Sequence, residues 1–371
     1  IYTVQFSMIQ PETSYFHTII PSCPWHFAAD GLSLHQLITT IMKRFIHTLI
    51  LALFAMVALA DNPLPYSNDI PGPVLTDSAA VARLLSWDQT ATPKAAHDWA
   101  AIAAPMVRGC RTNMEKARAI YRWLCDNITY DYTYTIYDAE TCYERRTGVC
   151  NAYSLLFCEL ARAVGIKAYR IVGDAKTSLE DTSATGRHAW VKVVLDEAGK
   201  FTILADPTWG AGNEADTWFN VDPSWMLFTH LPDNSDDQLV PDKLDKATFL
   251  TLPYIFAGIK ILGIKGRPYL ESYRKGRHIY IPSFSSSALR NDEKYTMPQT
   301  GTLSVGKTYN FVVTGSREPG CWGAAAQTNV VRRNRTWTLS VRPTEAGNLY
   351  LSLGDNWIVT YKVEKMSVGG H

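Results

Sequence analysis

The sequence lacks the features that mark several common classes of protein. Its charge is nearly balanced, with 36 Lys and Arg against 35 Asp and Glu, whereas a non-specific nucleic-acid binder needs a basic face to displace counterions. Seven Cys in 371 residues are too few for a disulfide-dense scaffold. There is no HExxH motif or CxxC pair for zinc, no glycine-rich phosphate loop and no Gly-x-Ser-x-Gly elbow. Internal repeats and low-complexity tracts are absent as well.

Aromatic side chains, by contrast, are abundant. Phe, Trp and Tyr make up 12% of the chain, including 11 Trp and 19 Tyr. Such side chains suit β-sheet surfaces and clefts that bind carbohydrate or peptide, without choosing between them. The 46% hydrophobic and 19% charged residues are ordinary for a globular protein, and at roughly 150 residues per domain the length predicts two to three domains.

Residues 42–60 have the layout of a secretory signal peptide. A basic Met-Lys-Arg at 42–44 precedes an apolar run that closes with Ala-Leu-Ala at 58–60, a small-x-small cleavage pattern. A single membrane anchor is the alternative, and it is disfavoured because the run is shorter than the ~20 residues that a span needs. We therefore expect a secreted, periplasmic or cell-envelope protein, with residues 1–41 as a non-native upstream extension from a misplaced start codon.

The remainder of the chain divides into four expected segments. Residues 61–107 are expected to form an N-terminal arm and helices, 108–245 a catalytic domain, 246–276 a connector and 277–371 a C-terminal β-sandwich-like domain. The sandwich is inferred from short strands separated by turn signals. Its expected strands are 278–284, 309–314, 336–341, 349–353 and 357–363.

Inside the catalytic domain, a capping-box spacing at 112–115 predicts the start of an amphipathic helix. Residues 150–164 form a second predicted helix, which is apolar on most of its surface, is therefore expected to be buried, and stops at Gly165. Short strands are expected at 167–172, 188–195 and 201–206.

Three segments carry residues with catalytic potential. They are Thr-Gly-Val-Cys-Asn-Ala-Tyr at 147–153, Gly-Arg-His-Ala-Trp-Val at 186–191 and Ala-Asp-Pro-Thr-Trp-Gly at 205–210. Cys150 falls in the first turn of the buried helix, where the helix dipole and free backbone N–H groups favour a thiolate.

His188 and Asp206 fall on two strands that are expected to form a hairpin. If Leu195 faces Gly199 across a three-residue loop, the apolar side chains share one face and His188 lies directly opposite Asp206. Asp206 would then fix the tautomer of His188 and stabilise its imidazolium, while His188 takes the proton of Cys150.

Each of these residues also has a simpler interpretation. A Cys at a helix start is most often a small buried hydrophobe, a His in a strand is often structural, and an Asp before Pro is often a turn former. Their joint occurrence favours a catalytic Cys150, His188 and Asp206. His97 and His230 are expected to be poorer bases, because neither has an adjacent strand with a carboxylate.

These residues resemble the transglutaminase-like superfamily over about 108–240. The matching elements are Gly-Val-Cys-x-x-Tyr, His-x-Trp and Asp-x-Thr-Trp, together with Ile-Thr-Tyr-Asp-Tyr at 128–132. Trp-Phe-Asn-Val-Asp-Pro at 218–223 and Phe-Thr-His-Leu-Pro at 228–232 are similar to its kyphoscoliosis-peptidase branch. The resemblance implies an α+β fold with a papain-like core, in which a helix carries the Cys and an antiparallel sheet carries the His and Asp. It also implies the roles of nucleophile, base and orienting acid for the three residues.

The sequence departs from animal transglutaminases, which use calcium and stabilise the oxyanion with a Trp well upstream of the His. No Trp lies between Trp123 and Trp190, and no EF-hand-like loop is present. We expect the Cys150 N–H and a second donor, either a Tyr or the Thr141 hydroxyl, to bind the oxyanion, with no metal or other cofactor. The residues expected to line the substrate site are Tyr153, Trp190 and Trp209.

The leading hypothesis is an exported cysteine hydrolase that attacks an amide of a protein or peptide, such as a cell-wall peptide, through a thioester at Cys150. An acyl transferase, in which an amine replaces water, is the second hypothesis. The third is an inactive family member that organises proteins at the envelope through its β-domain. Neither nucleic acid nor a stable membrane span after signal cleavage is expected.

Overall fold

The computed structural model describes residues 71–86, 97–211, 217–277, 279–290 and 292–365. The predicted signal peptide and upstream extension lie outside these residues. All of the described residues belong to one compact unit, Pro63–His371. Within the described part of the chain, no helix has the length and apolar character needed to cross a membrane.

The helices of the first half begin at side-chain caps that the sequence supplies. Asp77 caps α2 (Ser78–Leu85), Asp98 caps α3 (Trp99–Met106) and Asp138 caps α5 (Ala139–Arg145). The predicted capping box is present at the start of α4 (Asn113–Asn127), and the predicted buried helix is α6 (Cys150–Ala163). Gly165, with a φ of 83°, follows α6 as expected for a helix that ends in a left-handed residue.

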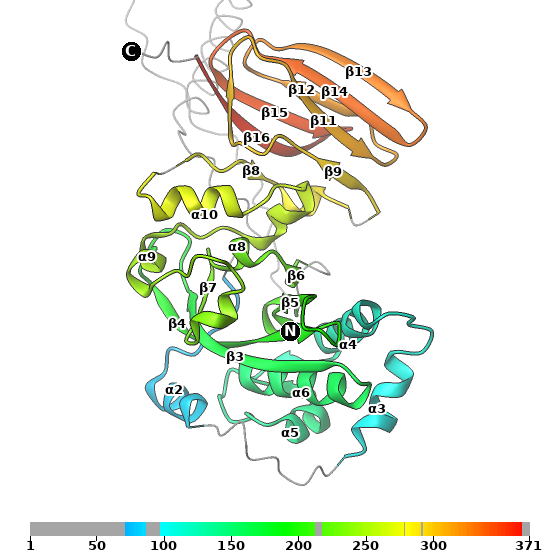
Figure 1. Ribbon diagram of the computed structural model, residues 1–371, viewed down its shortest axis with the longest axis vertical. Helices are drawn as coiled ribbons and strands as arrows, with labels where there is room; N and C mark the ends of the chain where they lie inside the picture. Colours follow the sequence, from blue (N-terminus) through cyan, green and yellow to red (C-terminus); the bar gives the residue numbers. More distant parts are fainter. Residues whose placement is uncertain (1–70, 87–96, 212–216, 278, 291, 366–371) are drawn as a thin grey trace, which may run out of the picture. The chain divides into compact units, whose positions relative to one another are not determined.

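An antiparallel sheet of five strands, in the order β6-β5-β4-β3-β7, packs against α6 (Figure 1). The strands are β3 (Lys167–Lys176), β4 (Thr185–Val194), β5 (Thr202–Ala205), β6 (Phe219–Val221) and β7 (His230–Pro232). Two single-turn helices, α7 (Pro207–Gly210) and α8 (Pro223–Met226), follow β5 and β6. The short parallel pair of β1 (Thr129–Tyr130) and β2 (Thr147–Gly148) leads into α6. This is the helix-and-antiparallel-sheet core that the sequence predicts.

The register of the β4–β5 hairpin differs from the predicted one by two residues. Leu195 pairs with Phe201 rather than Gly199, and its N–H donates to the Phe201 carbonyl at 2.7 Å. The longer loop leaves the Phe201 side chain 69% exposed, although the prediction placed it on the apolar face. A two-residue shift keeps each side chain on its face, because strand side chains alternate with a period of two. His188 and Asp206 therefore remain on one face as diagonal neighbours instead of direct partners.

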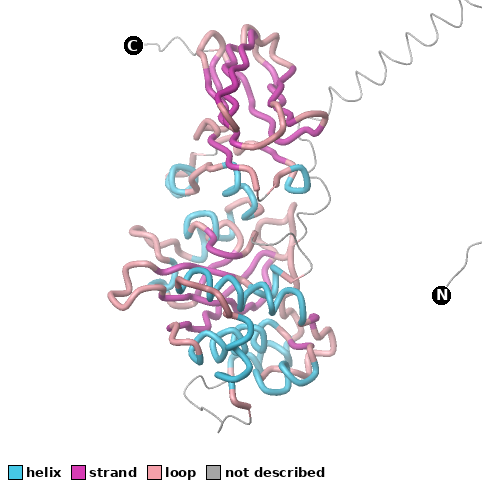
Figure 2. The backbone as a smooth tube through the Cα atoms, turned by 90° about the vertical axis from the view of Figure 1, so that its right-hand side faces the viewer, coloured by secondary structure: helices cyan, strands magenta, loops and turns pink. Residues whose placement is uncertain are grey.

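Helical segments connect this core to the C-terminal strands. They are the 3-10 helix η1 (Ser235–Gln238), α9 (Lys246–Thr251), η2 (Ala257–Leu262) and α10 (Arg267–Arg274). The strands beyond them form two sheets, β10-β16-β15-β12 with β8 beside β16, and β13-β14-β11-β9. Figure 2 shows that helices accompany the five-stranded sheet and the connecting segments, whereas strands predominate in the C-terminal part.

The two C-terminal sheets pack face to face, as the predicted β-sandwich requires. The rings of Phe311 and Tyr361, one from each sheet, lie 5.5 Å apart between the sheets. The expected strand at 278–284 is reduced to Ser283–Phe284. The strands are β8 (Ser283–Phe284), β9 (Lys294–Thr296), β10 (Thr302–Ser304), β11 (Tyr309–Thr314), β12 (Pro319–Trp322), β13 (Gln327–Arg333), β14 (Thr336–Arg342), β15 (Gly347–Leu353) and β16 (Asn356–Glu364). The 3-10 helix η3 (Ser286–Ala288) lies between β8 and β9.

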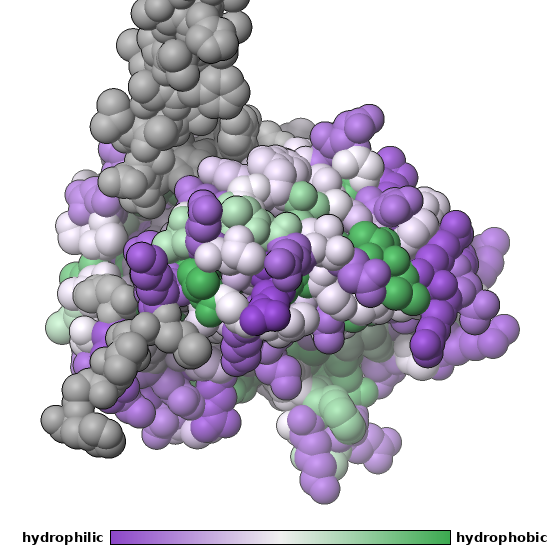
Figure 3. Space-filling model, turned by 90° about the horizontal axis from the view of Figure 1, so that it is seen from above, coloured by the Kyte–Doolittle hydropathy of each residue, from purple (hydrophilic) through white to green (hydrophobic). Residues whose placement is uncertain are grey.

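The outer strand β13 is exposed along its whole length. It carries Arg332 and Arg333, and charged side chains on an edge strand disfavour pairing with another chain. Seen from above, hydrophobic residues form small separate patches among hydrophilic ones (Figure 3).

Candidate active site

The nucleophile candidate Cys150 is held at the start of α6 by the loop before it. The carboxylate of Asp131 accepts hydrogen bonds from the backbone N–H groups of Thr133, Thr135 and Ile136 at 2.8–2.9 Å. The Ile136 carbonyl in turn accepts the N–H of Val149 at 3.0 Å, one residue before Cys150. Burial alone would raise the pKa of Asp131, but these hydrogen bonds lower it to about 2, so the loop is fixed by an ionised carboxylate.

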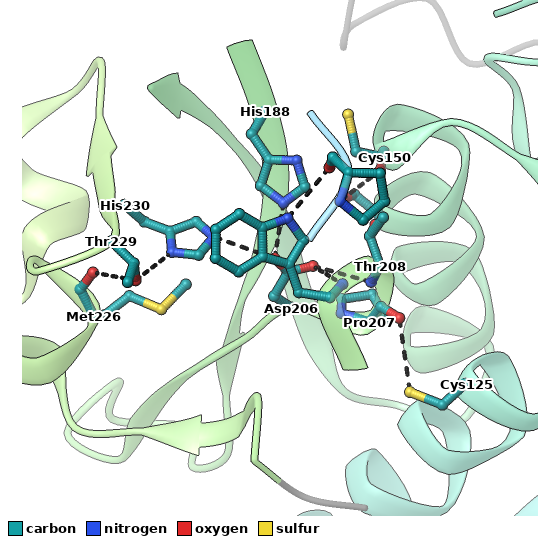
Figure 4. Close-up of polar contacts among 12 residues, drawn as sticks. Cys125, Cys150, His188, Asp206, Pro207, Thr208, Met226, Thr229 and His230 are labelled. Carbon is teal, nitrogen blue, oxygen red and sulfur yellow. Dashed lines mark hydrogen bonds and ion pairs between the residues drawn. The ribbon is translucent and has the colours of Figure 1, made fainter. Parts of the chain in front are cut away.

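His188 and Asp206 form a buried pair next to Cys150 (Figure 4). The Nε2 atom of His188 lies 2.7 Å from Oδ2 of Asp206, and all three side chains are 0% exposed. Oδ1 of Asp206 accepts the N–H groups of Thr208 and Trp209 at 2.9 and 3.1 Å, which caps α7. One carboxylate oxygen thus anchors the residue to the backbone while the other orients the histidine.

The charges of the pair support each other strongly enough to overcome burial. Burial lowers the pKa of His188, but the Asp206 carboxylate and then the Cys150 thiol raise it, to about 10 overall. Burial raises the pKa of Asp206, yet the two histidines hold it well below its usual range. The buried Nδ1 of His188 makes no hydrogen bond of standard geometry among the described residues and is the nitrogen left to interact with Cys150. The surroundings of His188 therefore favour an imidazolium beside Cys150.

His230 also belongs to this cluster, which corrects the expectation that it lacks a carboxylate neighbour. Its Nε2 lies 3.2 Å from Oδ2 of Asp206, and its Nδ1 lies 2.8 Å from the Thr229 hydroxyl. Burial lowers the pKa of His230 to about 4, so the ring is neutral and donates its Nε2 proton to Asp206. The sequence hid this contact because β7 has three residues and pairs with β3, far away in the chain.

Comparisons with known proteins identify the family of the region that contains this site. Residues 100–223 match the family model described as Transglutaminase-like superfamily. The chain carries a transglutaminase-like domain. Kyphoscoliosis peptidase of Homo sapiens is 26% identical over 163 residues, which is 38% of this chain and 24% of that protein. Cytokinesis protein 3 of Saccharomyces cerevisiae is 26% identical over 166 residues, 39% of this chain and 18% of that protein.

The chain thus spans about a quarter or less of the length of these relatives. A crystal structure of a TGase is similar over 37% of this chain and 38% of its own, with 19% identity and a TM-score of 0.25.

A buried arginine in the transglutaminase-like domain adds positive charge near the nucleophile. Arg170 on β3 donates a hydrogen bond from Nη1 to the side chain of Asn151, which follows Cys150. Nδ2 of Asn151 donates to the Tyr137 carbonyl at 2.7 Å. Burial lowers the pKa of Arg170, while the Cys150 charge raises it, so the guanidinium and a thiolate favour each other. Reasoning from the sequence missed Arg170, which looked like an ordinary polar strand residue.

The aromatic residues expected to bind substrate are instead packed inside the domain. The Tyr153 hydroxyl donates to the Ile128 carbonyl at 2.6 Å, and its side chain is 0% exposed. Trp190 and Trp209 are each 1% exposed. Tyr153 is therefore part of the hydrophobic core. The rings of Trp190 and Trp209 can contact a substrate only if the residues packed over them move.

Of the two expected oxyanion donors, a tyrosine has the better position. Thr141 lies in the first turn of α5, where its N–H bonds the Asp138 carboxylate. Tyr130 packs on the hydrophobic cluster that contains Cys150, and its buried hydroxyl has no hydrogen-bond partner among the described residues. Burial and then the Cys150 charge raise its pKa, which keeps the hydroxyl protonated and able to donate.

His188, Asp206 and His230 also have the residue types of a metal site, since their ligand atoms lie within 4.8 Å of one another. Ligands of a tetrahedral zinc ion at 2.0–2.1 Å lie about 3.3 Å apart. The 2.7 Å contact between His188 and Asp206 is shorter than that and fits a direct hydrogen bond.

A separate cavity of about 600 Å³ is lined by residues of β6, α8 and η2. It includes none of His188, Asp206 and His230.

Proposed function

We propose that this protein is an exported cysteine hydrolase that cleaves amide bonds in proteins or peptides, a cell-wall peptide among the candidates. The observation that carries the proposal is the buried His188, which pairs with Asp206 through Nε2 and leaves Nδ1 for the Cys150 thiol. An imidazolium in this position stabilises a thiolate, the form of Cys that attacks carbonyl carbons. Export rests on the signal-peptide pattern of residues 42–60.

The reaction begins when the Cys150 thiolate, whose proton is held by His188, bonds to the amide carbon of the substrate as the C=O π bond opens. The resulting oxyanion accepts hydrogen bonds from the Cys150 N–H and the Tyr130 hydroxyl. His188 then gives its proton to the departing amine as the C–N bond breaks, which leaves a thioester on Cys150. Water then attacks the thioester and His188, as base, takes its proton. The C–S bond breaks, which releases the acid product and restores the Cys150 thiolate beside the His188 imidazolium.

Product analysis tests this proposal. The full chain is incubated with a peptide mixture, with and without hydroxylamine, and products are identified by mass spectrometry. New carboxyl termini indicate hydrolysis, whereas hydroxamates that form in place of hydrolysis products indicate the acyl transferase. Cys150→Ser should abolish all products, and Cys158→Ser, which changes a buried Cys on the same helix, should retain them. An absence of products from every variant, including those with an uncovered site described below, would favour the scaffold hypothesis.

A further inference from the structure

An extended segment of the chain's own N-terminal part crosses the active site. Residues 71–86, here called the strap, place Leu75 in an antiparallel bridge with Arg187, next to His188. The Leu75 N–H donates to the Arg187 carbonyl at 2.8 Å, and the Arg187 N–H donates back at 2.9 Å. Leu75 is 0% exposed and belongs to the same hydrophobic cluster as Cys150. The pale blue ribbon of the strap passes beside Cys150 in Figure 4.

Two glycines create the space in which the strap lies. A Cβ atom on Gly72, in the strap, would fall 2.3 Å from the Trp209 ring, and one on Gly186, in β4, would fall 2.5 Å from the Val74 side chain. The Trp209 indole also donates to the Pro73 carbonyl at 3.2 Å. The strap and the core therefore fit each other closely on both sides of the bridge.

Helix α2 anchors the far end of the strap. Ala80 and Leu84 are buried, and the Ala80 carbonyl accepts the Tyr137 hydroxyl at 3.2 Å. By contrast, residues 72–76 make three hydrogen bonds to the core, two from the backbone and one from the Trp209 indole, in addition to the packing of the buried Leu75 side chain. Displacement of residues 72–76 would therefore break few polar contacts and would leave the contacts of α2 in place.

We propose that residues 72–76 occupy the subsite for the substrate peptide and so inhibit the enzyme until they are displaced. The identification of this groove as a substrate subsite rests on the proposed function. The position of residues 72–76 over Cys150 rests only on the contacts described above. The groove fits an extended peptide that pairs antiparallel with Arg187 and places an aliphatic side chain where Leu75 lies. Backbone pairing supplies affinity in this mode, and the pocket supplies specificity.

The test measures the rate at which iodoacetamide modifies Cys150, mapped by mass spectrometry on the full chain. Gly72→Val should drive the strap off Trp209, and Leu75→Ala should weaken it without a clash. Both should raise the rate at least tenfold over the natural protein. Ala79→Val, on the exposed face of α2, is the matched control and should leave the rate unchanged. Equal rates in the natural protein, Gly72→Val and Leu75→Ala would overturn the proposal.

Two further experiments test whether the groove under the strap binds a peptide by itself. A synthetic peptide with the sequence of residues 71–79 should slow modification of Leu75→Ala, and the same peptide with Asp in place of Leu should not. Gly186→Ala narrows the groove itself, so its Cys150 should react quickly and the peptide should give no protection. If the peptide protects Gly186→Ala equally, the assigned groove is wrong.

The outcomes also distinguish this inference from the hydrolase proposal. Fast modification of Cys150 in Leu75→Ala without any peptide cleavage would support the proposal that the strap covers Cys150 and would contradict the hydrolase proposal. Equal rates of peptide cleavage by the natural protein and by Leu75→Ala would support the hydrolase proposal and would contradict inhibition by the strap.

Discussion

The guanidinium of Arg170 donates a hydrogen bond to the side chain of Asn151, the residue that follows Cys150 on α6. A positive charge from the neighbouring strand is thereby fixed beside the nucleophile, in addition to the imidazolium of His188. Arg170 is 8% exposed, so solvent screens this charge little. Cys150, the first residue of α6, thus has two cationic groups nearby.

Replacing Arg170 with Met should make the thiolate of Cys150 harder to form. We expect the midpoint of Cys150 alkylation to move upward by about one pH unit, which corresponds to about 1.4 kcal/mol. Arg162→Gln, which breaks an exposed pair with Glu159, is the control and should leave the midpoint in place. An unchanged midpoint in Arg170→Met would show that its charge does not act on Cys150.

Asp206→Asn should narrow the pH range in which the site works. With Asp206 present, His188 stays protonated until about pH 10. Because this imidazolium protonates the leaving amine, kcat/KM for peptide cleavage in the Leu75→Ala background should fall above that pH. The amide carries no charge to hold the imidazolium, and burial then lowers the His188 pKa, so the alkaline limb should move down by two units or more. The measurement is the dependence of the rate on pH. A fall in rate that stays near pH 10 in Asp206→Asn would contradict the pairing of Asp206 with His188.

His230 should position Asp206 rather than act as the base. His230→Ala removes one hydrogen bond from Asp206, and we expect about a tenfold loss of kcat/KM, comparable to losing about 1.4 kcal/mol. His188→Ala should instead abolish turnover. The assay uses the Leu75→Ala background, in which the site is uncovered. Equal losses in the two variants would mean that His230 has a direct part in proton transfer.

Asp131→Asn should lower stability by about 1–3 kcal/mol at pH 7, because the loop before Cys150 loses the charged acceptor of its backbone hydrogen bonds. The folded pKa of about 2 lies below the unfolded value of 3.8. The stabilisation is therefore present above pH 3.8 and is lost as the pH falls through about 2. Urea unfolding of both proteins between pH 7 and 2.5 should show the difference shrinking at acid pH, and a constant difference would refute the ionic role.

The sequence was informative wherever the evidence lay in local pattern. The capping box at Thr112, the helix that starts at Cys150 and the facing of His188 toward Asp206 all follow from short-range periodicity. The hairpin loop was predicted two residues too short, yet the site residues stayed on one face because the error was an even number. In the sandwich, β9, β10, β12 and β13 escaped prediction because they are short, carry turn residues or are exposed and polar.

Contacts between distant segments could not be found in this way. The pairing of Leu75 with Arg187, the arrival of His230 at Asp206 and the bond from Arg170 to Asn151 each depend on how separate elements pack. None of these contacts leaves a periodic signal in the sequence. Tyr153 was misplaced for the same reason, since its spacing from Cys150 does not show that its hydroxyl reaches the Ile128 carbonyl.

Mapped alkylation of the Leu75→Ala protein at pH 6 tests the central claim most directly. If Cys150 is the nucleophile activated by His188, iodoacetamide should modify it ahead of the partly exposed Cys110, Cys125 and Cys321, and His188→Ala should remove that preference. Modification of Cys150 that is no faster than that of the other cysteines, or that is unchanged by His188→Ala, would contradict a Cys–His–Asp site.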